Sequence, residues 1–441
     1  MTKRLRCALI GLLALPGWAQ TPTPLYFPPT TGPAWASTTP QSLGWCQPPL
    51  DTLLAYLGRR HTKGFMVLKD GRVVVEQYYG TFTRDSLWYW ASAGKSLTAT
   101  LVGIARQDGL LSLTDSASRF LGRGWTAAPA AKERLITVRH QLTMTTGLDD
   151  TPPAPCDNES TQAACLLYRA DAGSRWAYHT GPYRKLQPLL AAAAGLSINQ
   201  YTNQKIGGVI GMGGAWAGDV YYSRLRDAAR FGLLILARGR WNGTAVLRDT
   251  AYFRQMTTPA QPLNRSYGYL WWLNGQPSYQ LPQSQLVLPG PLVPTAPADM
   301  IMALGKNDQK IYVVPSLGLV VVRLGQSAGQ PHLALSSFDT ELWRRLMAAV
   351  QCRPTAAAPA ARRAPLAAYP VPAADELTVP LAAAWGRVRL RLLDARGRTV
   401  RHAEGQAPGQ GLSLRDLPTG PYYLQLIDRQ GKVIQTSHIM H

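Results

Sequence analysis

Ser92 and Lys95, three residues apart, are the pair of side chains in this sequence best suited to nucleophilic chemistry. At the start of a helix, residues at this spacing lie on one face, one turn apart. A serine hydroxyl is a weak nucleophile until a base takes its proton, and a lysine shielded from water has a lowered pKa and can be that base. The helix N-terminus would stabilise a developing oxyanion. The same spacing also fits a serine N-cap followed by an ordinary helical lysine.

The residues around Lys95 also match the end of a phosphate-binding loop, because Gly94 precedes it and Ser96 follows it. Such a loop requires a glycine five residues before the glycine of its Gly-Lys pair. That position is Tyr89, with a tryptophan on each side. These bulky side chains leave no room for a phosphate, so we exclude nucleotide binding.

The segments around this pair predict an α+β fold. Residues 64–79 form two predicted strands joined by a turn at Asp70 and Gly71, and residues 92–107 form a predicted helix with one apolar side. A mostly helical stretch continues to about residue 258. Strands are predicted again at residues 267–273, 300–304, 310–314 and 319–324, and a last helix at residues 336–350. If early and late strands share one sheet, the result is an antiparallel sheet flanked by helices, with a helical insertion.

The length of 441 residues allows one large domain and a smaller one, at about 150 residues per domain. We expect the large domain at residues 46–352, after an extended, Pro- and Thr-rich leader at residues 20–45. A linker rich in Ala, Pro and Arg follows at residues 353–367. Residues 368–441 alternate apolar and polar residues between turn signals, which predicts a small all-β, sandwich-like domain.

The first residues have the features of a secretory signal peptide. Three Lys and Arg residues among the first six precede an apolar run and a small-residue cleavage site that ends at Ala19. We therefore expect residues 1–19 to be removed and the protein to be exported, to the periplasm, the outer surface or the medium. No later stretch approaches the roughly 18 apolar residues that span a bilayer, so no transmembrane segment is expected.

The cysteines fit export into an oxidising compartment. Without Cys7, which lies in the apolar run, four remain, and four cysteines allow three pairings. Cys156 and Cys165 lie nine residues apart in a polar loop, so we expect a local bridge between them. That leaves Cys46 to pair with Cys352, which would join the two ends of the large domain. A zinc site is the other use of four cysteines, but the sequence has no C-x-x-C spacing.

Charge and composition restrict the partners. The formal charge is +21, which falls by three to +18 without residues 1–19, and 46% of the residues are hydrophobic. Such a globular, basic protein could attract an anionic surface polymer such as cell-wall material, although scattered basic residues fit simple solubility better. We expect a small-molecule or peptide substrate, no nucleic acid, no metal and no cofactor.

Several separated stretches resemble, in the same order, the serine hydrolases related to class C β-lactamases and D,D-peptidases. These stretches are residues 92–115, 136–148, 223–232, 311–316 and 320–325. The resemblance spans about residues 46–350 and implies a β-lactamase/transpeptidase-like fold. It also implies that Ser92 is the nucleophile that forms an acyl-enzyme and that Lys95 is its base.

The second element of that family is a Tyr-x-Asn triplet, whose place is taken here by Tyr178, His179 and Thr180. By this resemblance Tyr178 relays a proton between Ser92 and the leaving group, and beside a cationic lysine its pKa should fall. Thr180 departs from asparagine, because it can still donate and accept a hydrogen bond but reaches less far toward a substrate. His179 is an alternative general base for Ser92, although no paired aspartate is evident.

The third family element is a Lys-Thr-Gly-like triplet on a strand that lines the site. Lys306 keeps the positive charge, which could hold a substrate carboxylate, but Asp308 replaces the glycine and could crowd the strand edge. We expect a second oxyanion N–H from one of the residues from Asn307 to Gln309. An exposed hairpin without a ligand is the alternative for Lys306.

The last 70 or so residues, which include Leu417 to Gly420, resemble the C-terminal sorting domains of the type IX secretion system. An ordinary carbohydrate- or protein-binding β-sandwich is the alternative. The whole sequence predicts an exported serine hydrolase acting on a small ester, an amide, a D-amino-acid peptide or a β-lactam. The altered second and third elements favour an esterase or amidase over a dedicated β-lactamase. The rival prediction is a non-catalytic binding or sensor protein on the same fold, which the departures at Thr180 and Asp308 would suit.

Overall fold

The computed structural model divides the chain into two compact units, residues 1–354 and 355–441, each with its own hydrophobic core. The residues described are 24–329, 335–352, 368, 375–381, 386–405, 409–431 and 433–441. The predicted signal peptide (1–19) and linker (353–367) lie outside them. Within the described ranges, no helix is both long enough and apolar enough to cross a membrane.

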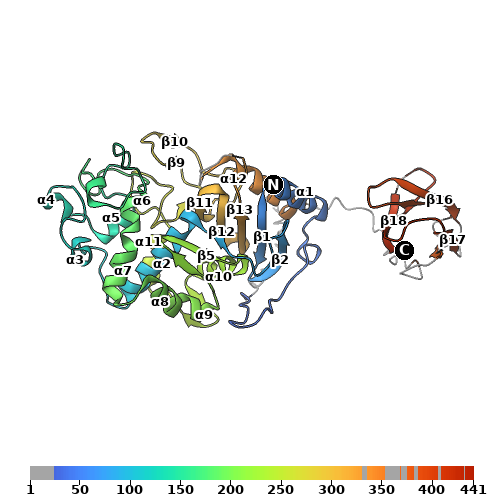
Figure 1. Cartoon of the computed structure of the whole chain (residues 1–441), viewed down its shortest axis with the longest axis horizontal. Coiled ribbons are helices and arrows are strands. Elements are labelled where there is room, and N and C mark those ends of the chain that lie inside the picture. The colour runs from blue at the N-terminus through green and yellow to red at the C-terminus, as the bar shows by residue number, and fades with distance from the viewer. Residues whose placement is uncertain are drawn as a thin grey trace, which may run out of the picture. The chain divides into compact units, whose positions relative to one another are not determined.

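A six-stranded antiparallel sheet runs through the first unit in the order β2-β1-β13-β12-β11-β8 (Figure 1). Its strands are β1 (Thr62–Lys69), β2 (Arg72–Tyr78), β8 (Trp272–Leu273), β11 (Ile301–Gly305), β12 (Gln309–Val314) and β13 (Leu319–Gly325). The two ends of the domain meet where β1 pairs with β13, with Val67 opposite Val321. Every residue of β12 and β13 is buried, as expected for strands covered on both faces. The predicted sheet of early and late strands is confirmed.

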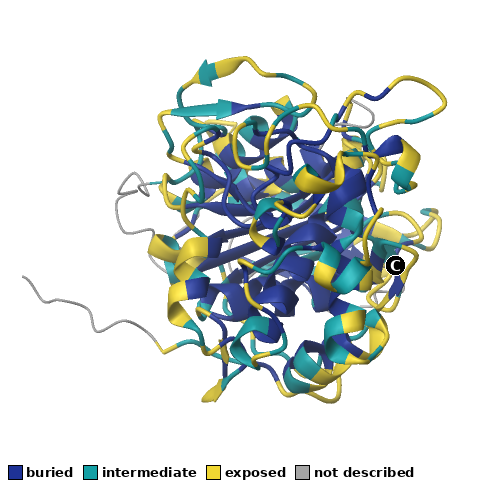
Figure 2. Ribbon diagram, turned by 90° about the vertical axis from the view of Figure 1, so that its left-hand side faces the viewer, coloured by how far each residue is buried: buried dark blue, intermediate teal, exposed yellow. Residues whose placement is uncertain are grey.

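Helices cover both faces of this sheet. On one face, Gly232 of α10 (Leu225–Leu236) packs so closely that an added Cβ would lie 2.4 Å from Val320 and 3.2 Å from Ile311. On the other face, the ring of Tyr312 meets Trp343 of α12 (Ser337–Val350), with 5.5 Å between centroids. Because successive strand residues point to opposite faces, α10 and α12 lie on opposite sides of β12. Figure 2 shows the buried residues gathered between these layers.

Both predicted disulfides are present. Cys46 precedes α1 (Gln47–Arg59) and is bonded to Cys352, just after α12, with 5.9 Å between their Cα atoms. This bridge joins the ends of two helices that pack against each other. Cys156 and Cys165 form the second bridge and close a loop within the helical insertion.

The predicted helical insertion lies between β2 and β11. It contains the helices α2 (Gly94–Gln107), α3 (Ser118–Leu121), α4 (Ala130–Glu133), α5 (Val138–Leu142), α6 (Thr180–Arg184), α7 (Leu186–Ala194), α8 (Ile198–Thr202), α9 (Gly208–Ile210), α10 and α11 (Thr250–Met256). Its short strands, besides β8, are β3 (Trp88–Tyr89), β4 (Ala215–Ala217), β5 (Val220–Ser223), β6 (Arg240–Trp241), β7 (Thr244–Ala245), β9 (Ser278–Gln280) and β10 (Val287–Pro289). The small sheet β3-β5-β4 packs beside the start of α2.

The strand expected at residues 267–273 is wrong in its extent, because β8 covers only Trp272–Leu273. Two backbone features prevent a longer strand. Leu270 has a φ of +57°, in the left-handed region, which ends any extended run. Gly268 packs against a neighbouring backbone so closely that a Cβ there would lie 2.2 Å from Met256 O.

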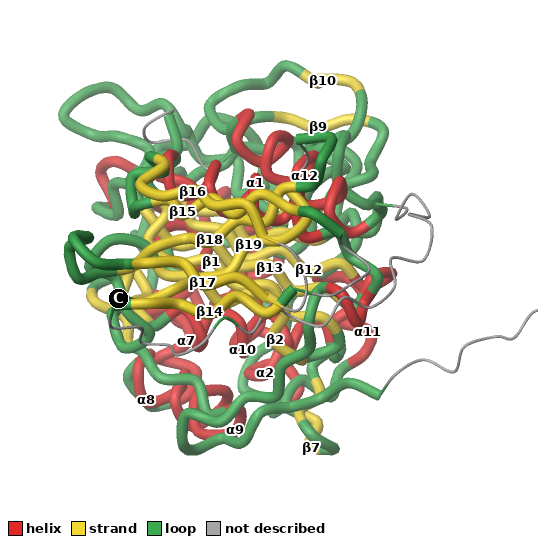
Figure 3. The backbone as a smooth tube through the Cα atoms, turned by 90° about the vertical axis from the view of Figure 1, so that its right-hand side faces the viewer, coloured by secondary structure: helices red, strands yellow, loops and turns green. Residues whose placement is uncertain are grey.

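The second unit is built from strands in its described residues, as predicted (Figure 3). These are β14 (Glu376–Pro380), β15 (Val388–Leu393), β16 (Thr399–Gly405), β17 (Gly409–Ser413), β18 (Pro421–Ile427) and β19 (Val433–Met440). They form a four-stranded sheet in the order β16-β15-β18-β19 and a separate β14-β17 pair. Buried leucines such as Leu390, Leu412 and Leu424 fill the space inside.

Candidate active site

Ser92 lies in a tight turn, η2 (Ala91–Ala93), that leads directly into α2. Ala91 has a φ of +48°, a left-handed conformation that a residue with a Cβ rarely adopts. The surroundings hold the turn in this conformation, because the preceding Trp90 is fully buried and its N–H donates to Tyr221 O at 2.8 Å. The strained turn leaves Ser92 partly exposed, as is common for residues at functional sites.

The end of β11 lies against the same turn. A Cβ added to Gly305, its last residue, would lie 2.3 Å from Trp90 O and 3.1 Å from the backbone nitrogen of Ala93. Only glycine allows this approach. The close packing places the backbone that follows Gly305, beginning with Lys306, beside Ser92.

The side chain of Lys95 reaches back to Ser92 from the first turn of α2. Its Nζ and the Oγ of Ser92 are hydrogen-bonded at 2.9 Å. The side chain is 3% exposed. Its ammonium group lies over two aromatic rings, 4.3 Å from the centroid of Tyr183 and 5.2 Å from that of Tyr178. Ser92 and Lys95 therefore meet as predicted, in a site walled by aromatic rings.

Burial lowers the pKa of Lys95 from its ordinary 10.5 to about 7, because the charged form loses its hydration. The nearby positive charges of Arg184 and Lys306 lower this pKa further, whereas the carboxylates of Glu159 and Asp219 oppose the shift. At neutral pH a large fraction of Lys95 is therefore uncharged and able to accept the proton of the Ser92 hydroxyl.

Tyr178 is the third side chain at this point. Its ring centroid lies 5.2 Å from Lys95 Nζ, and the ring stacks on Trp272 at 5.7 Å between centroids and meets Tyr267 edge-on at 6.2 Å. The expected fall in the pKa of Tyr178 is wrong: burial raises this pKa, and the side chain of Ser92 only partly opposes the rise. The reason is that burial removes the water that would stabilise the phenolate, and the carboxylate of Glu159 disfavours the phenolate as well. Tyr178 therefore stays a neutral phenol that can donate a proton.

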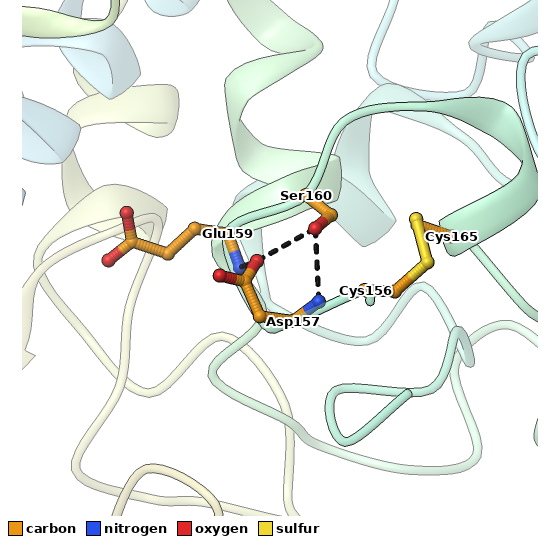
Figure 4. The surroundings of a disulfide bond; sticks show 5 residues. All are labelled: Cys156, Asp157, Glu159, Ser160 and Cys165. Carbon is orange, nitrogen blue, oxygen red and sulfur yellow. Dashed lines mark hydrogen bonds between the residues drawn. A yellow bond between two sulfur atoms is a disulfide. The ribbon is translucent and has the colours of Figure 1, made fainter. Parts of the chain in front are cut away.

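Figure 4 shows the loop that the Cys156–Cys165 disulfide closes. This loop holds the Tyr178 segment in place through Asn158. In this loop, Asn158 donates from Nδ2 to Tyr178 O at 3.0 Å and accepts at Oδ1 from the N–H of Thr180 at 3.1 Å. Thr180 is buried as the first residue of α6. Its backbone N–H is committed to Asn158, and its role as the second element stays a prediction.

The turn η5 (Lys306–Asp308) between β11 and β12 carries the third predicted element. Lys306 is about half exposed, and its Nζ lies 3.9 Å from the carboxylate of Glu159. Asn307 has a φ of +59° and donates from Nδ2 to the hydroxyl of Tyr89 at 2.9 Å. Both residues lie on the segment that Gly305 brings to the Ser92 turn.

One expectation for this segment needs correction. Asp308 does not crowd the strand edge, because its buried carboxylate turns inward to accept from Ser336 Oγ at 2.8 Å and from the N–H of Ala328 at 2.9 Å. The Gln309 side chain is fully buried and bridges to β13, where it donates to Gly325 O at 2.6 Å and accepts from the Gly325 N–H at 3.0 Å. The Gln309 side chain is therefore used within the sheet, and the expected oxyanion N–H from the backbone of Asn307 to Gln309 stays a prediction.

His179 does not act as an alternative partner of Ser92 in this structure. Its ring is buried, and neither ring nitrogen is hydrogen-bonded to the hydroxyl of Ser92. Burial lowers the pKa of His179 to about 4, with the carboxylate of Asp150 opposing the shift.

The tryptophans Trp90, Trp176, Trp271 and Trp272 are at most 2% exposed and belong to the core.

Sequence reasoning missed five residues close to the Ser92–Lys95 pair. They are Asn158, Glu159, Tyr183, Arg184 and Asp219. Asn158, Glu159 and Asp219 lie in loops whose positions relative to Lys95 are set only by tertiary packing, so no sequence motif marks them. Tyr183 and Arg184 follow the Tyr178 triplet by one helical turn, which is the one signal that could have found them. Within the described residues, no cluster of three or more His, Cys, Asp or Glu side chains could hold a metal ion.

Comparison with known families agrees with this architecture. Residues 51–336 match the Beta-lactamase family model, so the chain belongs to the β-lactamase family. Residues 367–440 match the Secretion system C-terminal sorting domain. The tail is therefore a type IX sorting domain, and the protein is exported to the outer surface or secreted.

Individual relatives are distant. A Bacteroides dorei structure provisionally named a β-lactamase is 19% identical, covers 70% of this chain and all of its own, and has a TM-score of 0.56. A Bacillus anthracis structure provisionally named a 6-aminohexanoate-dimer hydrolase is 17% identical, covers 75% of this chain and 92% of its own, and also has a TM-score of 0.56. An uncharacterized protein of Alkalihalophilus pseudofirmus is 21% identical over 308 residues, 60% of this chain and 84% of its own. These likenesses show the fold, and the family supports a serine hydrolase.

Proposed function

We propose that this protein is an exported serine hydrolase that works through an acyl-enzyme on Ser92. The observation that carries the proposal is the 2.9 Å hydrogen bond between Ser92 Oγ and a buried Lys95 whose pKa is lowered to about 7. A hydroxyl paired with a neutral amine at neutral pH is an activated nucleophile. The neighbouring phenol of Tyr178 supplies a second proton carrier.

The reaction begins when Lys95 takes the Ser92 proton as Oγ bonds to the substrate carbonyl carbon. The carbonyl π electrons move onto oxygen, and in this proposal backbone N–H groups of the Ser92 turn and of the segment after Gly305 stabilise that oxyanion. The close packing of Gly305 against the Ser92 turn supports this role. The bond to the leaving group then breaks as Tyr178 gives it a proton and is reprotonated from Lys95. Water attacks the resulting ester by the same steps in reverse and releases the acid.

Small esters and short amides are the substrates that we favour, with D-amino-acid peptides and β-lactams as further candidates. Two features support the preference. The side chain of Thr180 reaches less far than the asparagine of the Tyr-x-Asn element in the serine hydrolases that this chain resembles. The backbone N–H of Thr180 donates to Asn158. The rings of Tyr178 and Tyr183 lie beside the Lys95 amine, which suits an apolar acyl group.

A covalent probe tests the proposal. The exported protein, incubated with a fluorophosphonate and analysed by intact and peptide mass spectrometry, should gain one adduct on Ser92, and Ser92→Ala should gain none. The matched control is Ser112→Ala, which removes a surface hydroxyl at the end of a loop and should be labelled as the wild type is. No adduct on the folded wild type would refute the hydrolase and leave the non-catalytic binding protein, and an adduct on another residue would refute Ser92 as the nucleophile.

A further inference from the structure

Four charged side chains form a continuous chain of ion pairs beside Ser92. Lys306 Nζ lies 3.9 Å from Glu159 Oε1, Glu159 Oε2 lies 2.7 Å from Arg184 Nη2, and Arg184 Nε lies 2.5 Å from Asp219 Oδ2. Two positive and two negative groups alternate, so the cluster is balanced in charge. This balance applies to the cluster alone, since the chain as a whole carries a formal charge of +21.

Both cations of this cluster are tied to the catalytic residues by the backbone. Lys306 directly follows Gly305, which packs against the Ser92 turn. Arg184 directly follows Tyr183, whose ring lies 4.3 Å from Lys95 Nζ. Glu159 connects the two cations, and its carboxylate is close enough to Lys95 to act on the pKa of that amine.

The loop that carries Glu159 is held firmly. The Cys156–Cys165 disulfide closes it, and Asp157 Oδ1 accepts from the Glu159 N–H at 2.9 Å and from Ser160 Oγ at 2.8 Å. Figure 4 shows the Glu159 side chain extending away from the disulfide, to the opposite side of the loop. Arg184 reinforces this position by donating from Nη1 to the Glu159 carbonyl oxygen at 2.6 Å.

A substrate carboxylate that approached Lys306 would have to share it with the carboxylate of Glu159, which is already paired there. The two carboxylates, both beside Lys306 Nζ, would repel each other, and a substrate without a negative charge avoids this repulsion. We propose that Glu159 determines specificity, by disfavouring acyl donors that carry a carboxylate and leaving uncharged acyl donors as the preferred substrates. The inference rests on the proposed serine hydrolase activity and adds the charge class of its substrate.

Two esters that differ only in charge test this inference: 4-nitrophenyl hexanoate and the 4-nitrophenyl monoester of adipic acid. We expect the wild type to have the higher kcat/KM for the hexanoate. Glu159→Gln should raise the ratio of the adipate to the hexanoate kcat/KM about fivefold, because partly exposed charges interact weakly. Any effect of the variant on the pKa of Lys95 acts on both esters and cancels in this ratio. In the Glu159→Gln background, Lys306→Gln should remove this gain, since the freed lysine is what binds the added carboxylate.

Glu341→Gln is the matched control, because Glu341 is also a partly exposed carboxylate paired with arginines but lies on α12. It makes the same change in net charge and should leave the ratio of the two kcat/KM values unchanged. The inference is overturned if Glu159→Gln changes both esters equally, or if Glu341→Gln shifts the ratio as much. Failure of the hydrolase proposal is separate, because then neither ester is turned over and Ser92 is not labelled.

Discussion

The lowered pKa of Lys95 makes acylation of Ser92 depend on pH, with a midpoint near 7. Below this pH Lys95 is protonated and cannot accept the hydroxyl proton, so the rate should fall as pH falls. Above it Lys95 is neutral, and the rate should reach a plateau. Two changes test this dependence: a change of pH, and a variant in which residue 95 stays charged at every pH.

The size of the effect follows from the environment of Lys95. At its ordinary pKa of 10.5, about 0.03% of a lysine is neutral at pH 7, whereas at a pKa of about 7 about half is neutral. Burial thus increases the available base about a thousandfold. Two pH units below the midpoint, about 1% is neutral, so acylation should be about fiftyfold slower than at pH 7.

The assay is the rate of fluorophosphonate labelling of Ser92, followed by intact mass between about pH 5 and pH 9. Lys95→Arg keeps the positive charge at every pH and should lower the plateau rate by about 10²–10⁴-fold. The control Lys132→Arg changes a surface lysine that pairs with Asp171 and should follow the wild-type curve. A rate that is constant across this range, a midpoint near 10, or a Lys95→Arg variant with the wild-type rate would refute Lys95 as the base.

Three further outcomes are expected. Tyr178→Phe keeps the stacked ring but removes the hydroxyl proposed to relay the proton, so turnover of amides should fall about 10²–10⁴-fold with little change in Tm, and an unchanged kcat would contradict the proton relay. Asn158→Asp loses the donor to Tyr178 O but keeps the acceptor, so kcat should fall about tenfold while KM and Tm change little. A clear fall in Tm together with the fall in kcat would indicate a purely structural role. Replacing Cys46 and Cys352 by alanine removes a link between residues 306 positions apart and should lower the free energy of unfolding by about 2–5 kcal/mol in denaturant titrations, which an unchanged midpoint would contradict.

Local features of the sequence were sufficient to predict part of the candidate site and part of the fold. A serine and a lysine three residues apart at a helix start must share a face, so Ser92 and Lys95 could be paired before any coordinates were known. The partner strands β1 and β13 could be placed in one sheet because apolar strands at the two ends of a domain must be buried together. The Cys46–Cys352 bridge followed from the short separation of the other two cysteines.

Other features depended on contacts between distant segments. The direction of the Tyr178 pKa shift was predicted wrongly because it depends on how deeply two side chains are buried together, which spacing does not reveal. Asp308 turned inward because Ser336 and Ala328, brought there by tertiary packing, offer it hydrogen bonds. The strand expected at residues 267–273 stopped short because Leu270 adopts a left-handed backbone within the packed core.

The sequence by itself determined the chemistry available to this protein: a hydroxyl and an amine on one face of a helix, two disulfides, an antiparallel sheet and a β-rich tail. The tertiary structure alone decided how that chemistry is tuned. Burial sets the pKa of Lys95, and the loop bearing Glu159 sets the charge beside it, because both depend on the distances between segments that lie far apart along the chain. Desolvation and Coulomb interactions act through space, so they become defined only once the chain has folded.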